Sequence, residues 1–354
     1  MTGSVTVFYL FDVAQAIDLP ALRRRIGGDG LPAAIDVKSP GPPGVYYAPP
    51  PVVAAGAAFG HPSIDGFNVR VKFFDYGVMS LMLTRPFEGG WDELAAESQT
   101  LVENESLEQQ ASRVCRALVD ALAEAMVMPR AAFLSEDYLA FAITDAGGVP
   151  AAALLRDHGD VIAQILRGER AVLSADERAE ILRHRLSYFE TDLVVTAWNA
   201  AFVYDTRQSA QAAAEIFEVA NSQLLEFRYY DDFLEQELTR IYPTVHQTGW
   251  FRRREAAVRR LHSVFIDVNE LTDRTENAFK TVGDVYAARL FSLVTARLGL
   301  NAWKRSVEDK LKTLADIVRF AAEQSGIRKA NFLELLIVLI LLFELGLFFA
   351  GIMT

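Results

Sequence analysis

The sequence predicts an α+β N-terminal domain, then a long antiparallel, coiled-coil-like helical stalk, and finally one C-terminal transmembrane helix. Three observations lead to this fold class. Short apolar runs typical of strands alternate with amphipathic segments up to residue 205, apolar residues then recur at alternating three- and four-residue spacing, and a long apolar run lies near the C-terminus. The predicted domain boundaries are residues 1–205, 206–327 and 328–354.

The predicted α+β domain begins with a strand over Val5–Phe11 and a helix over Ala21–Ile26. The segment Phe67–Leu83 predicts a hairpin that turns at Asp75-Tyr76-Gly77, because glycine readily adopts the positive φ of a tight turn. The remaining predicted elements are a helix over Leu107–Met126, a strand over Tyr138–Ile143, a helix that starts near Ala175 and is capped by Ser174, and a strand over Asp192–Tyr204.

Two apolar seams predict the stalk. The first runs from Phe217 to Ile241 and the second from Phe251 to Tyr286, with a turn between them at Pro243–Gly249. Gly299 is expected to end the second long helix, and Asn301 can cap a third, shorter one. Three polar residues occupy seam positions and either set the helix register or lie at the seam edge: Asp231, Thr272 and Thr275.

The predicted anchor is the apolar run Asn331–Ile352. About 20 apolar residues cross a ~30 Å hydrocarbon core. Because Arg328 and Lys329 precede the run, the positive-inside rule keeps the bulk of the chain in the cytoplasm or in an equivalent compartment. The predicted location is a bacterial inner membrane. Glu334 can lie at the polar interface, whereas Glu344 lies deep in the span. Both are predicted transmembrane contact residues, and Glu344 alternatively marks an ion-linked site or a tolerated acid.

Composition limits the possible functions. The chain has 354 residues and a net charge of -11, which argues against general nucleic-acid binding, since that role needs a basic surface. Cys115 is the only cysteine, so neither an intrachain disulfide nor a cysteine-based metal site can form within one chain. The N-terminal apolar run lacks a basic start and is interrupted by Asp12, so no signal peptide is expected.

Catalytic signatures are scarce. The sequence has no phosphate-binding loop, no nucleophile elbow and no His spacing typical of a zinc enzyme, so neither a catalytic residue nor a cofactor nor a metal is predicted. One basic cluster could contact an anionic lipid headgroup, RNA or an acidic partner, or could simply be a solvated helix face. This possible contact patch consists of Arg252, Arg253, Arg254, Arg259 and Arg260.

Three segments resemble the YagE/RMD family, named for a requirement in meiotic nuclear division. They are the hairpin Phe73-Phe74-Asp75-Tyr76-Gly77-Val78, the helical stretch Tyr286–Leu311, and the anchor start Leu333-Glu334 with Glu344 ten residues on. The resemblance implies a single-span membrane protein that oligomerises. Mitochondrial members of that family face the matrix and support translation of organelle-encoded membrane proteins. The resemblance implies no catalytic residue.

The hypothesis that follows is a membrane-anchored oligomeric scaffold or assembly protein with no evident catalytic activity. Its expected partners are membrane lipid, further copies of the chain and an unidentified protein. Two alternatives belong to other classes. One is an ion-conducting or ion-regulating oligomer with channel-like architecture, and the other is a membrane-tethered enzyme of unknown reaction.

Overall fold

The computed structural model describes residues 1–28, 49–241, 266, 285–317 and 319. These residues belong to two compact units. The first unit comprises Met1–Tyr229 and the described residues 285–304. The described parts of the second unit are residues 230–241, 266, 305–317 and 319.

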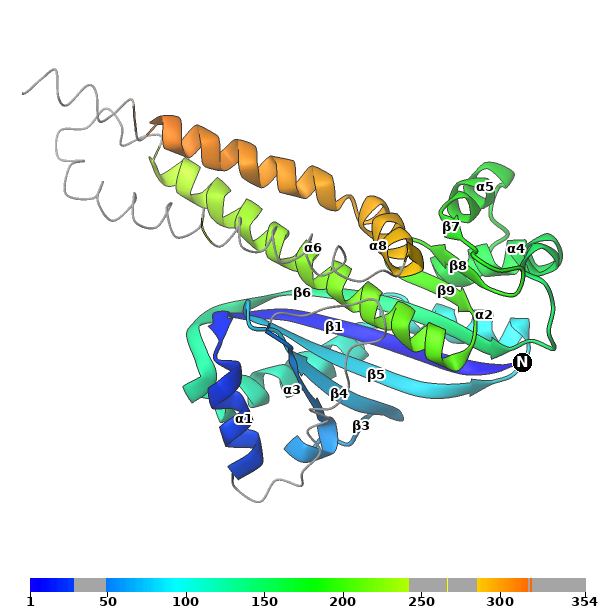
Figure 1. Cartoon of the computed structure of the whole chain (residues 1–354), viewed down its shortest axis with the longest axis horizontal. Helices are drawn as coiled ribbons and strands as arrows, with labels where there is room; N and C mark the ends of the chain where they lie inside the picture. The colour runs from blue at the N-terminus through cyan, green and yellow to red at the C-terminus, as the bar shows by residue number, and fades with distance from the viewer. Residues whose placement is uncertain (29–48, 242–265, 267–284, 318, 320–354) are drawn as a thin grey trace, which may run out of the picture. The chain divides into compact units, whose positions relative to one another are not determined.

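A nine-stranded sheet forms the centre of the first unit (Figure 1). Its strand order is β2-β4-β5-β1-β6-β9-β8-β7, with β3 paired to β4. All pairings are antiparallel except the parallel pair β6–β9. The strands are β1 (Thr2–Ile17), β2 (Val52–Ala55), β3 (Ser63–Ile64), β4 (Phe67–Phe73), β5 (Val78–Glu88), β6 (Met126–Asp145), β7 (Arg185–Leu186), β8 (Leu193–Thr196) and β9 (Ala200–Tyr204).

Helices cover both faces of this sheet (Figure 1). The helices are α1 (Leu19–Gly28), α2 (Trp91–Leu101), α3 (Glu105–Ala121), α4 (Ala151–Arg167), α5 (Ala175–Arg183), α6 (Arg207–Ile241) and α8 (Val285–Arg297), with single 3₁₀ turns at Gly56–Phe59 and Ala123–Ala125. Successive residues of a strand point to opposite faces. In β1, Val5 and Val7 therefore join the core formed with α1 to α5, whereas Phe8 and Leu10 are buried on the other face.

Helix α6 covers this second face of the sheet. Every residue from Ile216 to Phe227 is buried, and Phe217 packs against Tyr138 of β6 with ring centroids 5.6 Å apart. A surface helix buries only one stripe, so burial of all sides marks a core helix. The same helix continues beyond Tyr229 into the second unit.

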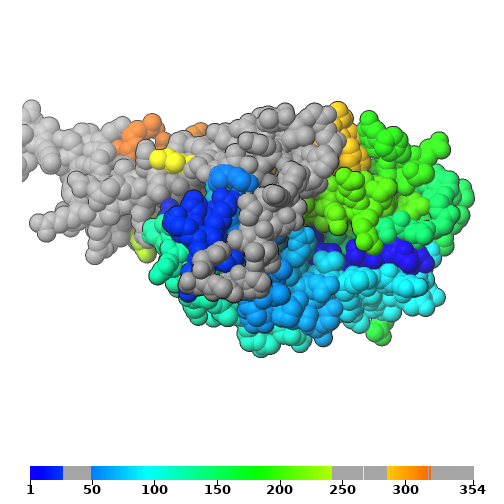
Figure 2. Space-filling model, turned by 60° about the horizontal axis from the view of Figure 1, so that its bottom comes forward, coloured from blue at the N-terminus to red at the C-terminus, as the bar shows by residue number. Residues whose placement is uncertain are grey.

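The chain start closes one end of the sheet. The Met1 ammonium donates a hydrogen bond of 3.0 Å to the Gly89 carbonyl, just after β5. Figure 2 shows this region in space-filling form, with the first residues of β1 in dark blue between the cyan residues of β5 and α2 and the green residues of α6.

In the second unit, polar contacts connect α6 to the helix over residues 300–317, beside the buried apolar side chains of Leu234, Val307 and Leu314. The Asp231 carboxylate accepts a 2.6 Å hydrogen bond from Ser306, and Lys310 pairs with both Asp231 (3.1 Å) and Glu235 (2.8 Å). Asp231, one of the predicted polar seam residues, thus binds the helix over residues 300–317. Thr272 and Thr275 lie outside the described residues.

The predicted fold class requires a correction. No helix in the part of the chain that the structure describes is long and apolar enough to cross a membrane. The segment predicted to do so, Asn331–Ile352, itself lies outside the described residues. A span needs about 20 predominantly apolar residues, whereas the longest described helix, α6, has charged residues throughout. The predictions of a transmembrane helix, a tail anchor and a single-pass membrane location are therefore withdrawn, and a sheet-rich N-terminal domain with helices replaces them.

Several predicted elements have different bounds: the strands predicted over Val5–Phe11 and Tyr138–Ile143 extend over Thr2–Ile17 and Met126–Asp145, and two other elements differ more. The strand predicted over Asp192–Tyr204 is a pair of strands, β8 and β9, which turn at residues 197–199. Both strands are buried throughout, so no polar alternation marks the turn between them. The helix predicted over Leu107–Met126 ends at Ala121, and β6 already begins at Met126.

The turn between β4 and β5 lies as predicted at Asp75–Gly77, and Gly77 has φ of 94°. Here the hairpin meets β1, because Val13 N–H donates to the Gly77 carbonyl at 3.0 Å. A Cβ on Gly77 would lie 1.9 Å from the Ala14 carbonyl oxygen. Gly77 therefore meets two requirements, a positive φ and a close approach of two backbones.

Gly77→Ala should lower the free energy of unfolding by more than about 3 kcal/mol, because it adds a backbone clash to an unfavourable φ. Gly60→Ala is the matched control, since Gly60 also has positive φ, 77°, but has open space where the Cβ would lie. The control should cost only about 1–2 kcal/mol. Urea unfolding of both variants measures this difference, and equal losses would contradict the close approach.

Candidate functional site

The residues predicted as sites from the sequence all lie outside the part of the chain that the structure describes. Glu334 and Glu344 lie outside the described residues, as do the five arginines of the possible contact patch, Arg252, Arg253, Arg254, Arg259 and Arg260. Within the described part of the chain, no group of three or more His, Cys, Asp or Glu side chains could hold a metal ion. Two other clusters of charged residues stand out there, one buried beneath α6 and one at the α5–β7–α8 corner.

The buried cluster centres on Lys72 of β4. Its ammonium contacts the carboxylates of Glu215 and Glu218 on α6, and its side chain is only 6% exposed. Ser80 of β5, the cross-strand neighbour of Lys72, lies beside Glu218. The sequence of β4 explains the position, because Val69, Val71 and Phe73 point to the core and leave Lys72 on the opposite face.

The charges of this cluster depend on one another. Burial raises the pKa of Glu218, and the Lys72 ammonium offsets part of that rise. The two carboxylates together raise the pKa of Lys72 against the opposing effect of burial, so the ammonium stays charged. A buried charge is tolerated only when it is paired in this way.

A second buried pair joins Asp12 of β1 to Arg130 of β6. Residues 130–133 of β6 lie opposite Val13 alone and form a wide bulge, and bulges commonly redirect a side chain. The Arg130 Nε donates to both Asp12 oxygens at 3.1 and 3.0 Å, and its Nη1 donates to the Tyr229 hydroxyl at 2.7 Å. Burial raises the pKa of Asp12 to about 6, although Arg130 opposes the rise.

Two further contacts attach α6 to the rest of the first unit. Arg228 pairs with Glu136 of β6, and the Tyr76 hydroxyl lies 2.7 Å from that of Ser222. Lys72 and Arg228 each contact an acidic side chain across the interface between sheet and helix, whereas Arg130 pairs with Asp12 within the sheet and reaches α6 through the Tyr229 hydroxyl. These cations thus serve to hold α6 on the sheet.

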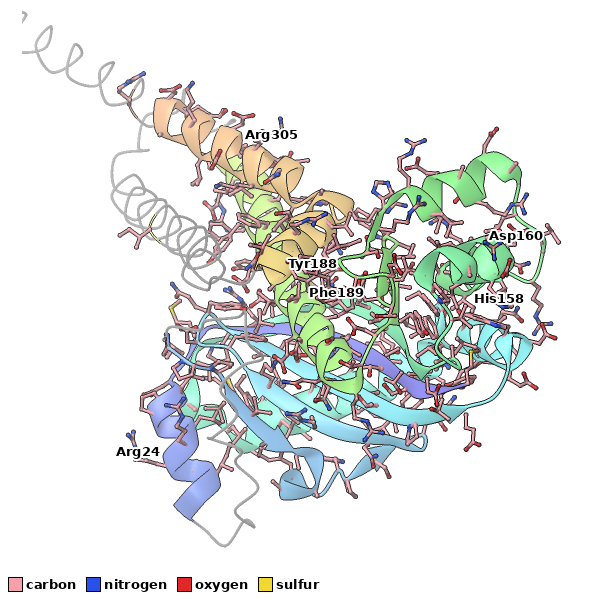
Figure 3. All side chains as sticks on the ribbon, turned by 45° about the vertical axis from the view of Figure 1, so that its right-hand side comes forward. Arg24, His158, Asp160, Tyr188, Phe189 and Arg305 are labelled. Carbon is pink, nitrogen blue, oxygen red and sulfur yellow. The ribbon has the colours of Figure 1, made fainter. Side chains whose placement is uncertain are left out.

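The second cluster of charged residues lies where α5, β7 and α8 meet. Beside it is a loop with two exposed aromatic residues. Tyr188 is 51% exposed and Phe189 is 67% exposed, at the tip of the β7–β8 hairpin (Figure 3). The buried Asp192 carboxylate accepts hydrogen bonds from the backbone N–H groups of both, at 2.8 and 2.6 Å. The ring of Tyr188 also meets Tyr286 edge-on, with centroids 6.1 Å apart. The loop backbone that carries the two rings is therefore fixed by Asp192.

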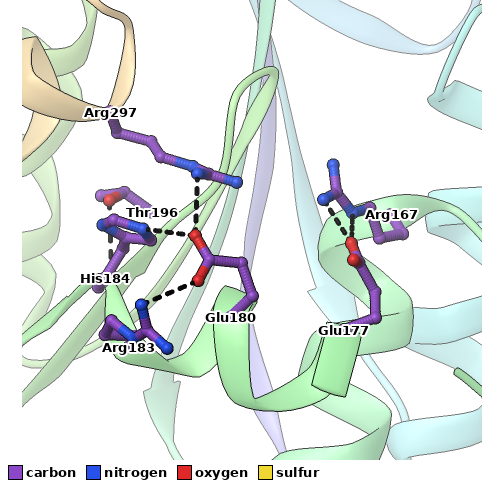
Figure 4. A network of polar contacts seen from close by, with 7 residues as sticks. All are labelled: Arg167, Glu177, Glu180, Arg183, His184, Thr196 and Arg297. Atoms are coloured by element: carbon purple, nitrogen blue, oxygen red, sulfur yellow. Dashed lines mark hydrogen bonds and ion pairs between the residues drawn. The ribbon is translucent and has the colours of Figure 1, made fainter. Parts of the chain in front are cut away.

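A polar network lies at the base of the same hairpin (Figure 4). Glu180 of α5 is its centre and accepts contacts from Arg183 at 3.2 Å, His184 at 3.1 Å and Arg297 at 3.7 Å. The His184 side chain and its neighbouring cations lower the pKa of Glu180. Nearby, Arg167 of α4 pairs with Glu177 and connects α4 to α5.

Sequence reasoning missed both clusters. Asp12 drew attention only because it interrupts an apolar run, and Lys72 only as part of a hairpin. The sequence did contain a signal that α6 buries polar groups, because Glu218, Gln223 and Glu226 lie in one helix with a dense apolar seam. No spacing rule connects Glu180 to Arg297, which lie 117 positions apart in the numbering.

Comparisons with known proteins point to one family. The family model described as "Uncharacterized protein MJ0711, N-terminal domain" matches residues 2–211. The Uncharacterized protein MJ0711 of Methanocaldococcus jannaschii is 22% identical over 196 residues, which cover 54% of this chain and 60% of the relative. No solved structure matches. The chain therefore spans less than two thirds of that relative's length, and the YagE/RMD assignment is not confirmed.

Lys72→Met should destabilise the protein by about 3–5 kcal/mol near pH 7, because it removes the ammonium that contacts the buried Glu218 carboxylate and the partly buried Glu215 carboxylate. Adding Glu218→Gln to Lys72→Met should recover part of the loss, since the fully buried charge is then gone. Arg156→Met is the control, because Arg156 belongs to an exposed pair with Asp157 and should cost at most about 1 kcal/mol. Urea unfolding measures the stability of all three variants. A loss in Lys72→Met as small as the control's would contradict a stabilising role for the ion pairs of Lys72.

Asp12→Asn should change how stability depends on pH. The folded pKa of Asp12, about 6, lies above its ordinary value of 3.8. Stability from this group is therefore fully present below about pH 4 and is lost as the pH rises through 6. Relative to the parent, Asp12→Asn should gain up to roughly 3 kcal/mol between pH 4 and pH 7.

Unfolding free energies of parent and variant at several pH values measure this gain. The control is Asp157→Asn, at an exposed ion pair. A difference between Asp12→Asn and the parent that stays constant from pH 4 to pH 7 would contradict the raised pKa.

Proposed function

We propose that this protein, which belongs to the family described as "Uncharacterized protein MJ0711, N-terminal domain", is an oligomeric scaffold or assembly protein. Its sheet-rich domain provides a fixed frame, and an exposed aromatic loop on that frame contacts a second copy of the chain. The scaffold role assigns no catalytic step to any described residue.

The aromatic loop supports this role most directly. Tyr188 and Phe189 expose large apolar rings, and such residues are enriched among the few that dominate binding energy in protein interfaces. Asp192 holds their backbone N–H groups, so less conformational entropy is lost when a partner covers the rings.

The contacts that attach α6 to the sheet also support the scaffold role. Lys72 and Arg228 form ion pairs between α6 and the sheet, and Arg130 donates a hydrogen bond to the Tyr229 hydroxyl of α6. Because α6 continues into the second unit, this attachment also fixes the start of the helix that enters that unit. The arrangement suits a protein that presents surfaces to partners.

We also propose that the chain is a distant relative of the YagE/RMD family. This kinship rests on the hairpin Phe73–Val78 and the helical stretch Tyr286–Leu311, and it agrees with an oligomeric role. A solved structure of a YagE/RMD protein offers the test: kinship requires the strand order of the sheet described above, including the parallel β6–β9 pair.

The double substitution Tyr188→Ser with Phe189→Ser should weaken self-association of the full chain. Each interface aromatic of this kind contributes about 2 kcal/mol or more, so the dissociation constant should rise at least about 30-fold. Sedimentation velocity over a range of concentrations measures this shift. Val172→Ser is the control, because Val172 is 80% exposed and lies away from the aromatic tip in sequence.

Circular dichroism should show that the double variant keeps its fold, since both rings are exposed. A parent chain that stays monomeric at its highest soluble concentration would overturn the oligomeric scaffold. A double variant that associates as tightly as the parent would remove the aromatic loop from the contact.

A further inference from the structure

We propose that Arg297, Arg183 and His184 form a binding site for a phosphate group at the junction of α5 and α8. This site goes beyond the scaffold role and does not depend on it. All three side chains belong to the first unit and come from two helices and the residue that follows α5.

The site centres on Arg297, whose guanidinium is mostly buried and incompletely hydrogen-bonded. Its side chain is only 17% exposed, and the ion pair that it makes among the described residues, with Glu180, has a length of 3.7 Å, beyond hydrogen-bond distance. Its Nε is buried without a hydrogen-bond partner. A guanidinium carries several N–H donors in a fixed fork, and buried donors are nearly always satisfied. Among the described residues, therefore, Arg297 is a mostly buried cation whose Nε–H has no hydrogen-bond partner and whose contact with Glu180 is long.

The neighbouring groups extend this site. Arg183 and His184 approach the same carboxylate from α5 and its C-terminal end. Arg297 is the last residue of α8, where the helix dipole stabilises the positive charge of the arginine and does not itself attract an anion. With both arginines charged and Glu180 ionised, the cluster keeps a net positive charge even when His184 is neutral.

Glu180 acts as an internal counterion that satisfies this cluster only in part. One carboxylate oxygen lies 3.1 Å from His184 and 3.7 Å from Arg297, while the other lies 3.2 Å from Arg183 (Figure 4). Two oxygens and one negative charge thus serve three donor groups. A phosphate group offers more oxygens and a larger charge, and guanidinium forks bind such oxyanions in bidentate geometry. Glu180 is 40% exposed, so it can move aside when the anion arrives.

The two sides of this network predict opposite effects. Arg297→Gln should weaken phosphate binding at least about 10-fold, because charge-assisted hydrogen bonds are lost. Glu180→Gln should tighten phosphate binding several-fold, because it removes a competing negative charge. A network that served only to hold α5 against α8 would predict no phosphate dependence in either variant.

Isothermal titration calorimetry of the full chain with inorganic phosphate, at constant ionic strength set by chloride, tests the site. A second arm uses glycerol phosphate, and tighter binding there identifies an organic phosphate ester as the source, whereas equal binding identifies the phosphate group alone. A third arm uses acetate. Arg156→Gln, at an exposed ion pair, is the control for the loss of one arginine.

Phosphate binding by the parent and by Arg156→Gln, its loss in Arg297→Gln and its gain in Glu180→Gln would support the site. If Arg297→Gln fails to fold, the exposed Glu180→Gln still decides, because only a phosphate site predicts tighter binding. The proposal is overturned if the parent shows no phosphate binding, if Glu180→Gln does not tighten it, or if acetate binds as tightly as phosphate.

Discussion

The structure of the first unit depends on pairing the charges that α6 buries against the sheet. One face of the sheet meets α1 to α5 through apolar side chains, but the other face includes Asp12, Lys72 and Ser80. A helix that covered these groups without partners would incur a desolvation cost of several kcal/mol for each ion. Glu215 and Glu218 on α6 and Arg130 on β6 offset that cost. Paired burial is therefore the condition under which α6 can occupy this face.

Two irregular backbone features follow from that condition. The bulge at residues 130–133 of β6 brings Arg130 over Asp12, which a regular strand could not do at that register. The tight turn at Gly77 lets the β4–β5 hairpin approach β1, and it is followed by the β5 strand that carries Ser80. Irregular geometry thus occurs at the places where the sheet positions the polar groups that meet α6.

These constraints explain how far the sequence could predict the fold. Local chemistry was sufficient for the Gly77 turn, for the Ser174 cap, which accepts the Glu177 N–H at 3.2 Å, and for α6 as a helix. It was insufficient for the partner of α6, because an apolar seam looks the same whether it packs on a helix or on a sheet. Strand geometry puts Lys72 on the face opposite Val71, but whether that face meets water or another element is a tertiary property. The same limit hid the network around Glu180, whose members become neighbours only in the folded chain.

The two charged clusters differ in how many hydrogen bonds and ion pairs their cations make. This difference distinguishes a structural role from a ligand-binding role. Lys72 contacts two carboxylates, and Arg130 contacts both oxygens of Asp12 as well as the Tyr229 hydroxyl. Adding a ligand there would require breaking strong internal bonds in a buried layer. Among the described residues, Arg297 has a long contact with a partly exposed acid, so a ligand at that place would gain bonds while displacing little. Where a fold saturates its buried charges, those charges hold the frame together. Where it leaves a buried cation unsatisfied beside the surface, the bonding capacity remains available to a molecule from solution.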